Sequence, residues 1–269
     1  MTPHPVLDAF TGLYEFGLDA FQVEACRVVE EGKGVLVAAP TGSGKTVVGE
    51  FAVHLALETG RKAFYTTPIK ALSNQKYHDL VARYGSERVG LLTGDTSVNG
   101  EAPVVVMTTE VLRNMLYAGS GTLTGLGYVV MDEVHYLADR SRGAVWEEVI
   151  IHLPDSVALI SLSAPVSNAE EFGEWLETVR GDTVTIVEER RPVPLYQHVL
   201  VGRNADHQRL AVARQRGRVG RSVAVQFGRE RHGLRRGAVP HAAQESRAME
   251  VPRHSTAHRT ETDETRTHD

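Results

Sequence analysis

The stretch that decides the fold is GVLVAAPTGSGKT, which runs from Gly34 to Thr46. Its first six residues are small, apolar or β-branched, which predicts a strand over Gly34–Ala39. A glycine-rich turn follows and leads into apolar residues at helical spacing, which predict a helix over Lys45–Thr59. A strand, a glycine-rich loop and a helix in this order form a known arrangement for binding phosphate groups. The stretch therefore predicts a phosphate-binding loop inside an α/β domain.

Each residue type in this loop has a chemical reason to be there. Gly42 and Gly44 let backbone N–H groups turn inward around a phosphate, and the N-terminus of the following helix adds partial positive charge. Lys45 reaches the β- and γ-phosphates of a nucleotide, and Thr46 is able to ligate Mg²⁺. The loop departs from the usual pattern only at Ala39, which stands in place of the first glycine. The residues expected to hold the nucleotide are Thr41, Gly42, Ser43, Gly44, Lys45 and Thr46.

Short β-branched runs alternate with helical patterns from Gly34 to Val187. Several runs are continuously apolar, as strands buried on both faces are, so the alternation predicts a parallel sheet flanked by helices. The further strands expected are Lys62–Thr67, Val89–Leu92, Val104–Thr108, Tyr128–Met131, Ala158–Leu162 and Thr183–Val187. The further helices expected are Ile69–Tyr84, Glu110–Tyr117, Ala144–His152 and Asn168–Val179. For the last of these, Asn168 is the expected N-cap and Glu171 completes a capping-box pattern.

Two adjacent carboxylates, Asp132 and Glu133, follow directly after the expected strand Tyr128–Met131. Open α/β sheets bind ligands at the C-terminal ends of their strands. Alone, such a pair is usually a solvated turn, but a phosphate loop upstream favours a second part of one nucleotide site. We expect Asp132 to hold Mg²⁺ through water and Glu133 to orient the water that attacks the γ-phosphate. Together with Lys45 they form the expected catalytic set.

The net charge of −5 conceals two parts of opposite charge. Residues 1–203 carry 16 Lys and Arg against 26 Asp and Glu, whereas residues 204–269 carry 13 against 8. The second part contains no Lys or Ile, and Leu, Ile, Val and Phe supply only 9 of its 66 residues, too few to bury a core. We expect a folded domain over residues 1–190, an extended linker over 191–203 with Pro192 and Pro194, and a disordered Arg- and His-rich tail over 204–269. A frameshift in a GC-rich gene is one hypothesis for that tail.

The composition excludes several classes of protein. No apolar run approaches the roughly 20 residues that cross a bilayer, and the single cysteine, Cys26, cannot form a disulfide within the chain. The N-terminus has neither the basic nor the apolar region of a signal peptide. We therefore expect a cytoplasmic protein without a membrane partner.

The two motifs together resemble the signature of DExH-box superfamily 2 helicases, with Asp132–His135 reading DEVH. The surrounding sequence is similar to the superkiller-type branch of that family, which includes exosome-associated RNA helicases. The segments that carry this resemblance are FGLDAFQ at 16–22, TPIKALSNQK at 67–76, LTGD at 92–95, MTTEVLRNML at 107–116 and RGAVWEE at 142–148. The similarity extends from about Tyr14 to Val201. It implies a RecA-like lobe, the first of two, that uses ATP and Mg²⁺ and acts on single-stranded RNA or DNA.

The resemblance also assigns roles to single residues. Gln22 would read the edge of the adenine and Phe16 would stack on its face, although Phe16 could equally be a core aromatic. His135, Ser163 and Ala164 would couple hydrolysis to strand movement, and Pro165 stands where the family has a threonine. The residues implied at the nucleic-acid face are Pro68, Lys70, Gln75, Lys76, Thr109 and Arg113. Without the resemblance, Lys70 and Lys76 would read as solvated helix charges.

The function expected is therefore that of the N-terminal, ATP-binding lobe of an ATP-dependent nucleic-acid helicase, with RNA as the favoured substrate. The second lobe, which supplies arginine fingers, is absent from the recognisable sequence, so we expect the chain alone to be truncated and weakly active. Gln215–Arg221 resembles the finger motif, but its spacing is one residue short and we assign no finger there. The alternative is a non-catalytic module that binds ATP or nucleic acid.

Overall fold

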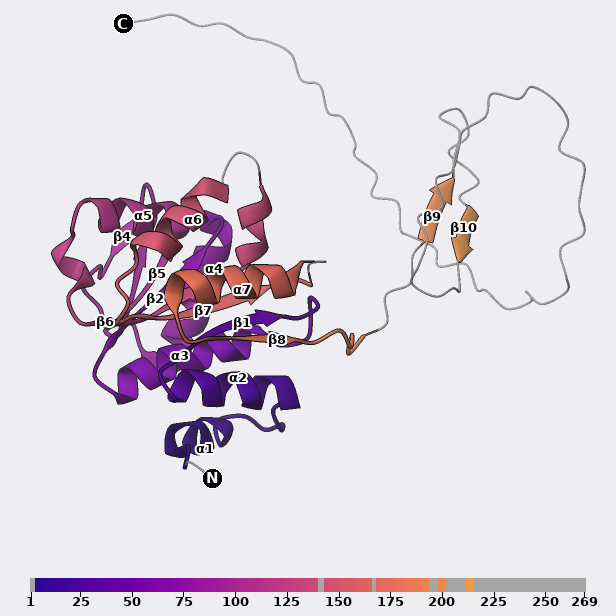
Figure 1. Cartoon of the computed structure of the whole chain (residues 1–269), viewed down its shortest axis with the longest axis horizontal. Helices are drawn as coiled ribbons and strands as arrows, with labels where there is room; N and C mark the ends of the chain where they lie inside the picture. The colour runs from indigo at the N-terminus through magenta and orange to yellow at the C-terminus, as the bar shows by residue number, and fades with distance from the viewer. Residues whose placement is uncertain (1–2, 140–142, 166–167, 194–197, 202–210, 215–269) are drawn as a thin grey trace, which may run out of the picture. The chain divides into compact units, whose positions relative to one another are not determined.

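The computed structural model describes residues 3–139, 143–165, 168–193, 198–201 and 211–214. Its centre is an eight-stranded sheet with the strand order β4-β3-β5-β2-β6-β7-β1-β8 (Figure 1). Every neighbouring pair in this sheet is parallel except β3 with β4. The strands are β1 (Gly34–Ala38), β2 (Lys62–Thr67), β3 (Val89–Leu92), β4 (Ser97–Val98), β5 (Val104–Thr108), β6 (Leu126–Met131), β7 (Ala158–Ser163) and β8 (Thr183–Val187).

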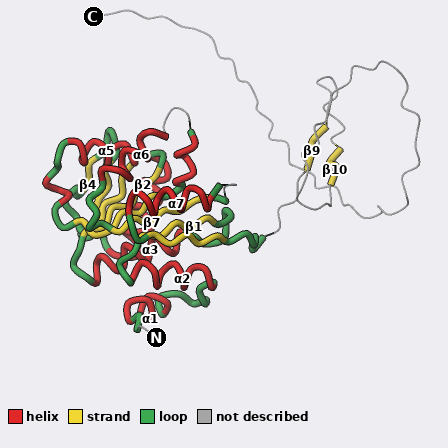
Figure 2. The backbone as a smooth tube through the Cα atoms, viewed as in Figure 1, coloured by secondary structure: helices red, strands yellow, loops and turns green. Residues whose placement is uncertain are grey.

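Helices cover both faces of the sheet, as Figure 2 shows. Alternate strand residues face opposite ways: Val35 and Val37 of β1 pack in one hydrophobic cluster and Leu36 packs in the other. The first cluster takes in α1, α2, α3 and α4, and the second takes in α5, α6 and α7. The helices are α1 (Pro5–Thr11), α2 (Ala20–Glu30), α3 (Thr46–Glu58), α4 (Lys70–Tyr84), α5 (Thr109–Tyr117), α6 (Gly143–His152) and α7 (Ala169–Arg180), with 3₁₀ turns η1 (Gly121–Leu123) and η2 (Val134–Ala138).

The predicted α/β fold is confirmed. All seven expected strands and all five expected helices are present, with ends shifted by at most two residues. Helices α1 and α2 and the short strand β4 were not expected. Asn168 stands at the N-cap of α7 as expected, but its side chain makes no capping hydrogen bond, so the predicted capping box does not form there.

The strand order places the sequence motifs along one edge of the sheet. Because the strands are parallel, their C-terminal ends meet at the same edge. On one half of that edge, the phosphate loop follows β1, Ala164 follows β7 and Asp132 follows β6, on three adjacent strands. On the other half, Pro68 follows β2, Thr109 begins α5 after β5, and residues 93–95 follow β3.

A separate two-stranded antiparallel hairpin pairs β9 (His198–Val201) with β10 (Ala211–Arg214). The sequence predicted an extended linker that ends at 203 and no structure after it. Within that tail the structure describes Ala211–Arg214 as a strand, and the predicted boundaries of linker and tail stay a prediction. The rest of the predicted tail lies outside the described residues. None of the helices in the described ranges is long and apolar enough to cross a membrane.

Candidate functional site

The phosphate loop joins the buried strand β1 to helix α3. Gly42 and Gly44 have φ angles of +84° and +79°, the left-handed region that glycine adopts without strain. The Ser43 N–H donates to the Pro40 carbonyl at 3.1 Å and closes the turn. At the start of α3 the Val47 and Val48 N–H groups donate back to the Gly44 and Lys45 carbonyls at 3.0 and 3.1 Å, and the N-terminus of the helix adds partial positive charge suited to an anion.

Among the described residues, this loop holds a lysine whose ammonium has no partner and a buried hydroxyl that has none. Lys45 is only 6% exposed, and none of the residues that the structure describes offers its ammonium a hydrogen bond or ion pair. The Ser43 hydroxyl is likewise buried without a hydrogen-bond partner in the described part of the chain. Buried polar groups are normally paired, and an exception of this kind calls for a ligand. The predicted set of Thr41, Gly42, Ser43, Gly44, Lys45 and Thr46 therefore fits a polyphosphate.

Gln22 of α2 reaches the phosphate loop from the side. It is 4% exposed; its Nε2 donates to the Gly44 carbonyl at 3.0 Å, and its Oε1 accepts from the Asp19 N–H at 2.8 Å. A Cβ added at Gly44 would lie 2.6 Å from Gln22 Nε2, so only glycine admits this approach. The Gln22 side chain thus holds the backbone of the phosphate loop in place. The predicted role of Gln22 toward adenine did not include this contact. Since Nε2 also donates to the Ser43 carbonyl at 3.4 Å, the predicted role toward adenine would use the second lone pair of Oε1.

Phe16 precedes α2 and is 61% exposed. Its ring centroid lies 5.2 Å from that of Tyr14 in a tilted arrangement. The alternative of a core aromatic is therefore wrong for Phe16, because most of its surface faces solvent. An exposed aromatic face of this kind is free to stack on a planar ligand.

The Asp132 carboxylate is held on both of its oxygens. Its Oδ1 accepts from the Glu133 N–H at 2.9 Å, and its Oδ2 accepts from the Tyr65 hydroxyl at 2.9 Å. Burial, and secondarily the charge of Asp132, raises the pKa of Tyr65 well above its ordinary value, which keeps the phenol protonated as a donor. Asp132 is 9% exposed, so one side of a buried carboxylate remains open beside the phosphate loop's half of the sheet edge.

Glu133 adopts a left-handed conformation, with φ +55° and ψ +42°. Residues other than glycine seldom adopt it, and such strain concentrates at functional sites. Its Oε2 lies 3.2 Å from His135 Nδ1, and the Ala164 nitrogen lies 3.5 Å from the same Nδ1, which can donate to the carboxylate or accept from the Ala164 N–H, one at a time. The structure thus brings the end of β6 to the end of β7, where the Ser163 hydroxyl donates to the Ala164 carbonyl at 2.7 Å. Glu133, His135, Ser163 and Ala164, predicted from separate segments, form one connected group.

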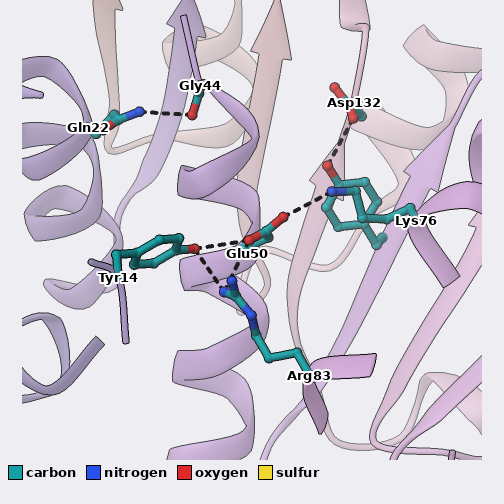
Figure 3. A network of polar contacts seen from close by, with 8 residues as sticks. Tyr14, Gln22, Gly44, Glu50, Lys76, Arg83 and Asp132 are labelled. Carbon is teal, nitrogen blue, oxygen red and sulfur yellow. Dashed lines mark hydrogen bonds and ion pairs between the residues drawn. The ribbon is translucent and has the colours of Figure 1, made fainter. Parts of the chain in front are cut away.

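A network of charged contacts continues from Asp132 into the protein (Figure 3). Glu50 of α3 pairs with Lys76 at 3.1 Å and with Arg83 at 3.1 Å, both from α4. The Tyr14 hydroxyl donates to Glu50 at 3.0 Å and accepts from Arg83 at 2.8 Å. The Lys76 ammonium lies over the Tyr65 ring, 5.3 Å from its centroid. The Lys76 side chain is 12% exposed and paired with Glu50, which does not support its predicted place at a nucleic-acid face, and that place stays a prediction.

Of the other residues expected at the nucleic-acid face, three reach the surface. Lys70 pairs with Asp95 at 2.8 Å and both side chains are more than half exposed. Gln75 is exposed on the same helix, α4. Arg113 of α5 lies 3.7 Å from Glu148 and is 31% exposed. Since β2 and β5 are neighbours, α4 and α5 begin at the same part of the sheet edge.

The remaining two, Pro68 and Thr109, are buried. Thr109 is fully buried and its hydroxyl donates to the Thr67 carbonyl at 3.4 Å, which joins β5 to β2 at their ends. Its side chain therefore holds the ends of β5 and β2 together, and the predicted place of Thr109 at the nucleic-acid face stays a prediction.

Sequence reasoning missed four side chains of this site: Tyr14, Glu50, Tyr65 and Arg83. None of these four residues belongs to a recognisable motif, and each is a common residue type in a helix, strand or loop. Their hydrogen bonds and ion pairs in this site span 26 to 69 residues of the chain, from Lys76 with Glu50 to Arg83 with Tyr14. No pattern within one segment could have revealed them.

The chain is similar to known helicases over the part that carries this site. It is 71% identical over 203 residues to the probable helicase HelY of Mycobacterium tuberculosis, which covers 76% of this chain and 22% of that protein. It is 48% identical over 195 residues to the DExH-box ATP-dependent RNA helicase DExH15 of Arabidopsis thaliana, which covers 70% and 17%. It is 45% identical over 200 residues to the exosome RNA helicase MTR4 of Homo sapiens, which covers 74% and 19%. The chain spans about a fifth of the length of these curated relatives.

Two solved structures share the fold. A hypothetical ATP-dependent RNA helicase from Sulfolobus tokodaii aligns with a TM-score of 0.55 at 20% identity, over 69% of this chain and 57% of that one. The DUF1998 helicase MrfA, bound to DNA and AMPPNP, aligns with a TM-score of 0.57 at 22% identity, over 70% and 30%. A family model described as DEAD/DEAH box helicase matches residues 19–172, more than half of the chain. With the nucleotide motifs on one sheet edge and these relatives, the chain belongs to the DEAD/DEAH box helicase family and is related to the DExH helicases HelY and MTR4.

Proposed function

We propose that this chain forms the ATP-binding lobe of an ATP-dependent helicase that acts on single-stranded nucleic acid in the cytoplasm. The observation that carries the proposal is the glycine loop with the largely buried Lys45, whose ammonium has no partner among the described residues, on the same sheet edge as Asp132 and Glu133. The relatives named as helicases support it. A single buried cysteine, Cys26, is compatible with a reducing compartment.

The residues present have separable tasks in ATP hydrolysis. Lys45 and the positive N-terminus of α3 bind the phosphates and neutralise their charge, and Thr46 and Asp132 hold Mg²⁺. When bound, Mg²⁺ supplies charge neutralisation at the transferred phosphoryl group. Glu133 orients the attacking water. Its Oε2 lies near His135 Nδ1, and the Ala164 N–H after the next strand lies near the same nitrogen. Gln22 holds the phosphate loop in place, and Phe16 offers its exposed face to the adenine.

The other half of the sheet edge is the proposed nucleic-acid face. Lys70, Gln75 and Arg113 are exposed at the surface of α4 and α5 and would contact phosphates without reading bases. We favour RNA over DNA because the Arabidopsis and human relatives are named RNA helicases. Hydrolysis by this lobe alone should be slow, since enzymes of this class gain about 10³ to 10⁵ in rate from an arginine that a second element supplies.

Titration of the full chain with a fluorescent ATP analogue and Mg²⁺ tests this proposal. We expect saturable binding that Lys45→Met abolishes and that Lys33→Met leaves unchanged, because Lys33 pairs with Glu31 at the exposed surface. Oligonucleotides of RNA and DNA with the same sequence should both bind, RNA more tightly. Lack of Mg²⁺-dependent nucleotide binding by the folded wild-type chain would refute the proposed function. Tighter binding of the DNA strand would refute the preference for RNA.

A further inference from the structure

The Tyr65 side chain touches the candidate metal site but has no part in the mechanism above. It lies on β2, beside β6, and is fully buried. Its hydroxyl donates to Asp132 Oδ2, while the Glu133 N–H donates to Asp132 Oδ1, each at 2.9 Å. Rotation of the carboxylate would break both hydrogen bonds in a buried setting. The two donors therefore fix the direction in which the remaining lone pairs of Asp132 point.

The ring of Tyr65 makes a second contact, to helix α4. The Lys76 ammonium lies 5.3 Å from the ring centroid and is anchored by Glu50 at 3.1 Å. A cation over an aromatic face is attracted to it and resists displacement of the ring. Since α4 also carries the exposed Lys70 and Gln75, Tyr65 connects the helix of the proposed nucleic-acid face with a carboxylate of the nucleotide site.

We propose that Tyr65 is a positioning residue that sets the Asp132 carboxylate for Mg²⁺, and that Lys76 links this setting to α4. The inference rests on the proposed nucleotide site. Hydrogen bonds to a carboxylate that holds a metal orient it, and their loss typically lowers metal affinity or activity 10- to 100-fold. A shift of α4 moves Lys76 and, with it, the Tyr65 ring beneath the ammonium. The Tyr65 hydroxyl passes this movement to the Asp132 carboxylate.

The test uses the full chain with Tyr65→Phe, which removes the hydroxyl and keeps the ring under Lys76. Binding of a fluorescent ATP analogue is measured as Mg²⁺ is raised, and again in EDTA. We expect the Mg²⁺ concentration at half-saturation to rise about tenfold, the low end of the range because Asp132 acts through water, with binding in EDTA unchanged. Tyr128→Phe is the matched control, since it removes the same group from β6 near the end of the strand remote from Asp132. It should leave the Mg²⁺ dependence at the wild-type value.

The outcomes separate the two proposals. If wild-type chain binds nucleotide with Mg²⁺ and Tyr65→Phe shows the same Mg²⁺ dependence, the positioning role is overturned, even if the variant melts at a lower temperature. If the folded wild-type chain shows no Mg²⁺-dependent binding, the nucleotide site itself is refuted.

Lys76→Met tests the link to α4. We expect it to raise the Mg²⁺ requirement less than Tyr65→Phe does, and to add nothing in the Tyr65→Phe background, because its effect passes through the hydroxyl. Additive effects of the two substitutions would show that Lys76 acts by another route and would overturn the link.

Discussion

Replacing Gly44 by alanine tests how Gln22 braces the phosphate loop. Alanine at a φ of +79° costs about 1–2 kcal/mol by itself. The added Cβ would meet Gln22 Nε2 at 2.6 Å, so the amide must swing away. It then gives up its hydrogen bonds to the Gly44 carbonyl and the Asp19 N–H, each contributing about 0.5–1.5 kcal/mol.

Gly42→Ala is the matched control, because its φ of +84° is similar and an added Cβ meets nothing within 4 Å. We expect Gly44→Ala to lower the free energy of unfolding by about 1–3 kcal/mol more than Gly42→Ala does. The assay is urea unfolding without nucleotide, followed by fluorescence of the buried Trp146 and by circular dichroism. Equal losses for the two variants would show that Gln22 moves aside at no cost. In a Gln22→Ala background the difference should vanish.

Three further predictions concern charged and titratable groups. Without nucleotide, Lys45→Met should leave the free energy of unfolding unchanged or raise it by about 1 kcal/mol, because it removes an ammonium that has no partner among the described residues from a largely buried side chain. Urea unfolding checks this, and a lower free energy of unfolding would reveal a stabilising partner. Glu50→Ala should cost about 3–5 kcal/mol in the same assay, since it leaves two cations unpaired. Glu101→Ala should cost far less, because the Glu101 carboxylate that pairs with Lys62 is 73% exposed. Burial lowers the pKa of His54 below its ordinary 6.5, so the unfolded chain binds the proton more tightly and stability is lost as pH falls below 6.5. His54→Leu should flatten that decline in unfolding measured across pH, and an unchanged slope would contradict this origin.

Local sequence was sufficient for the fold class and for the core of the nucleotide site. Continuous apolar runs such as Val104–Thr108 indicated buried parallel strands because a strand covered on both faces has no polar side. The phosphate loop and the Asp132–Glu133 pair were recognisable because their chemistry depends on residues adjacent in the chain. Helix α2 escaped prediction, and so did the contact of Gln22 with Gly44, which joins two different elements.

By itself, the sequence determined most of the strands and helices of the sheet domain, the glycine loop proposed to bind phosphate and the carboxylates that follow β6. Only the tertiary structure decided that β7 lies between β6 and β1, so that His135 meets Ala164. It also decided that Lys76, which reads as a surface charge, is drawn against Glu50 and Tyr65. The physical reason is the range of the interactions: strand and loop preferences act within a few residues, whereas the Tyr65–Asp132 hydrogen bond spans 67 residues and exists only once the sheet has assembled.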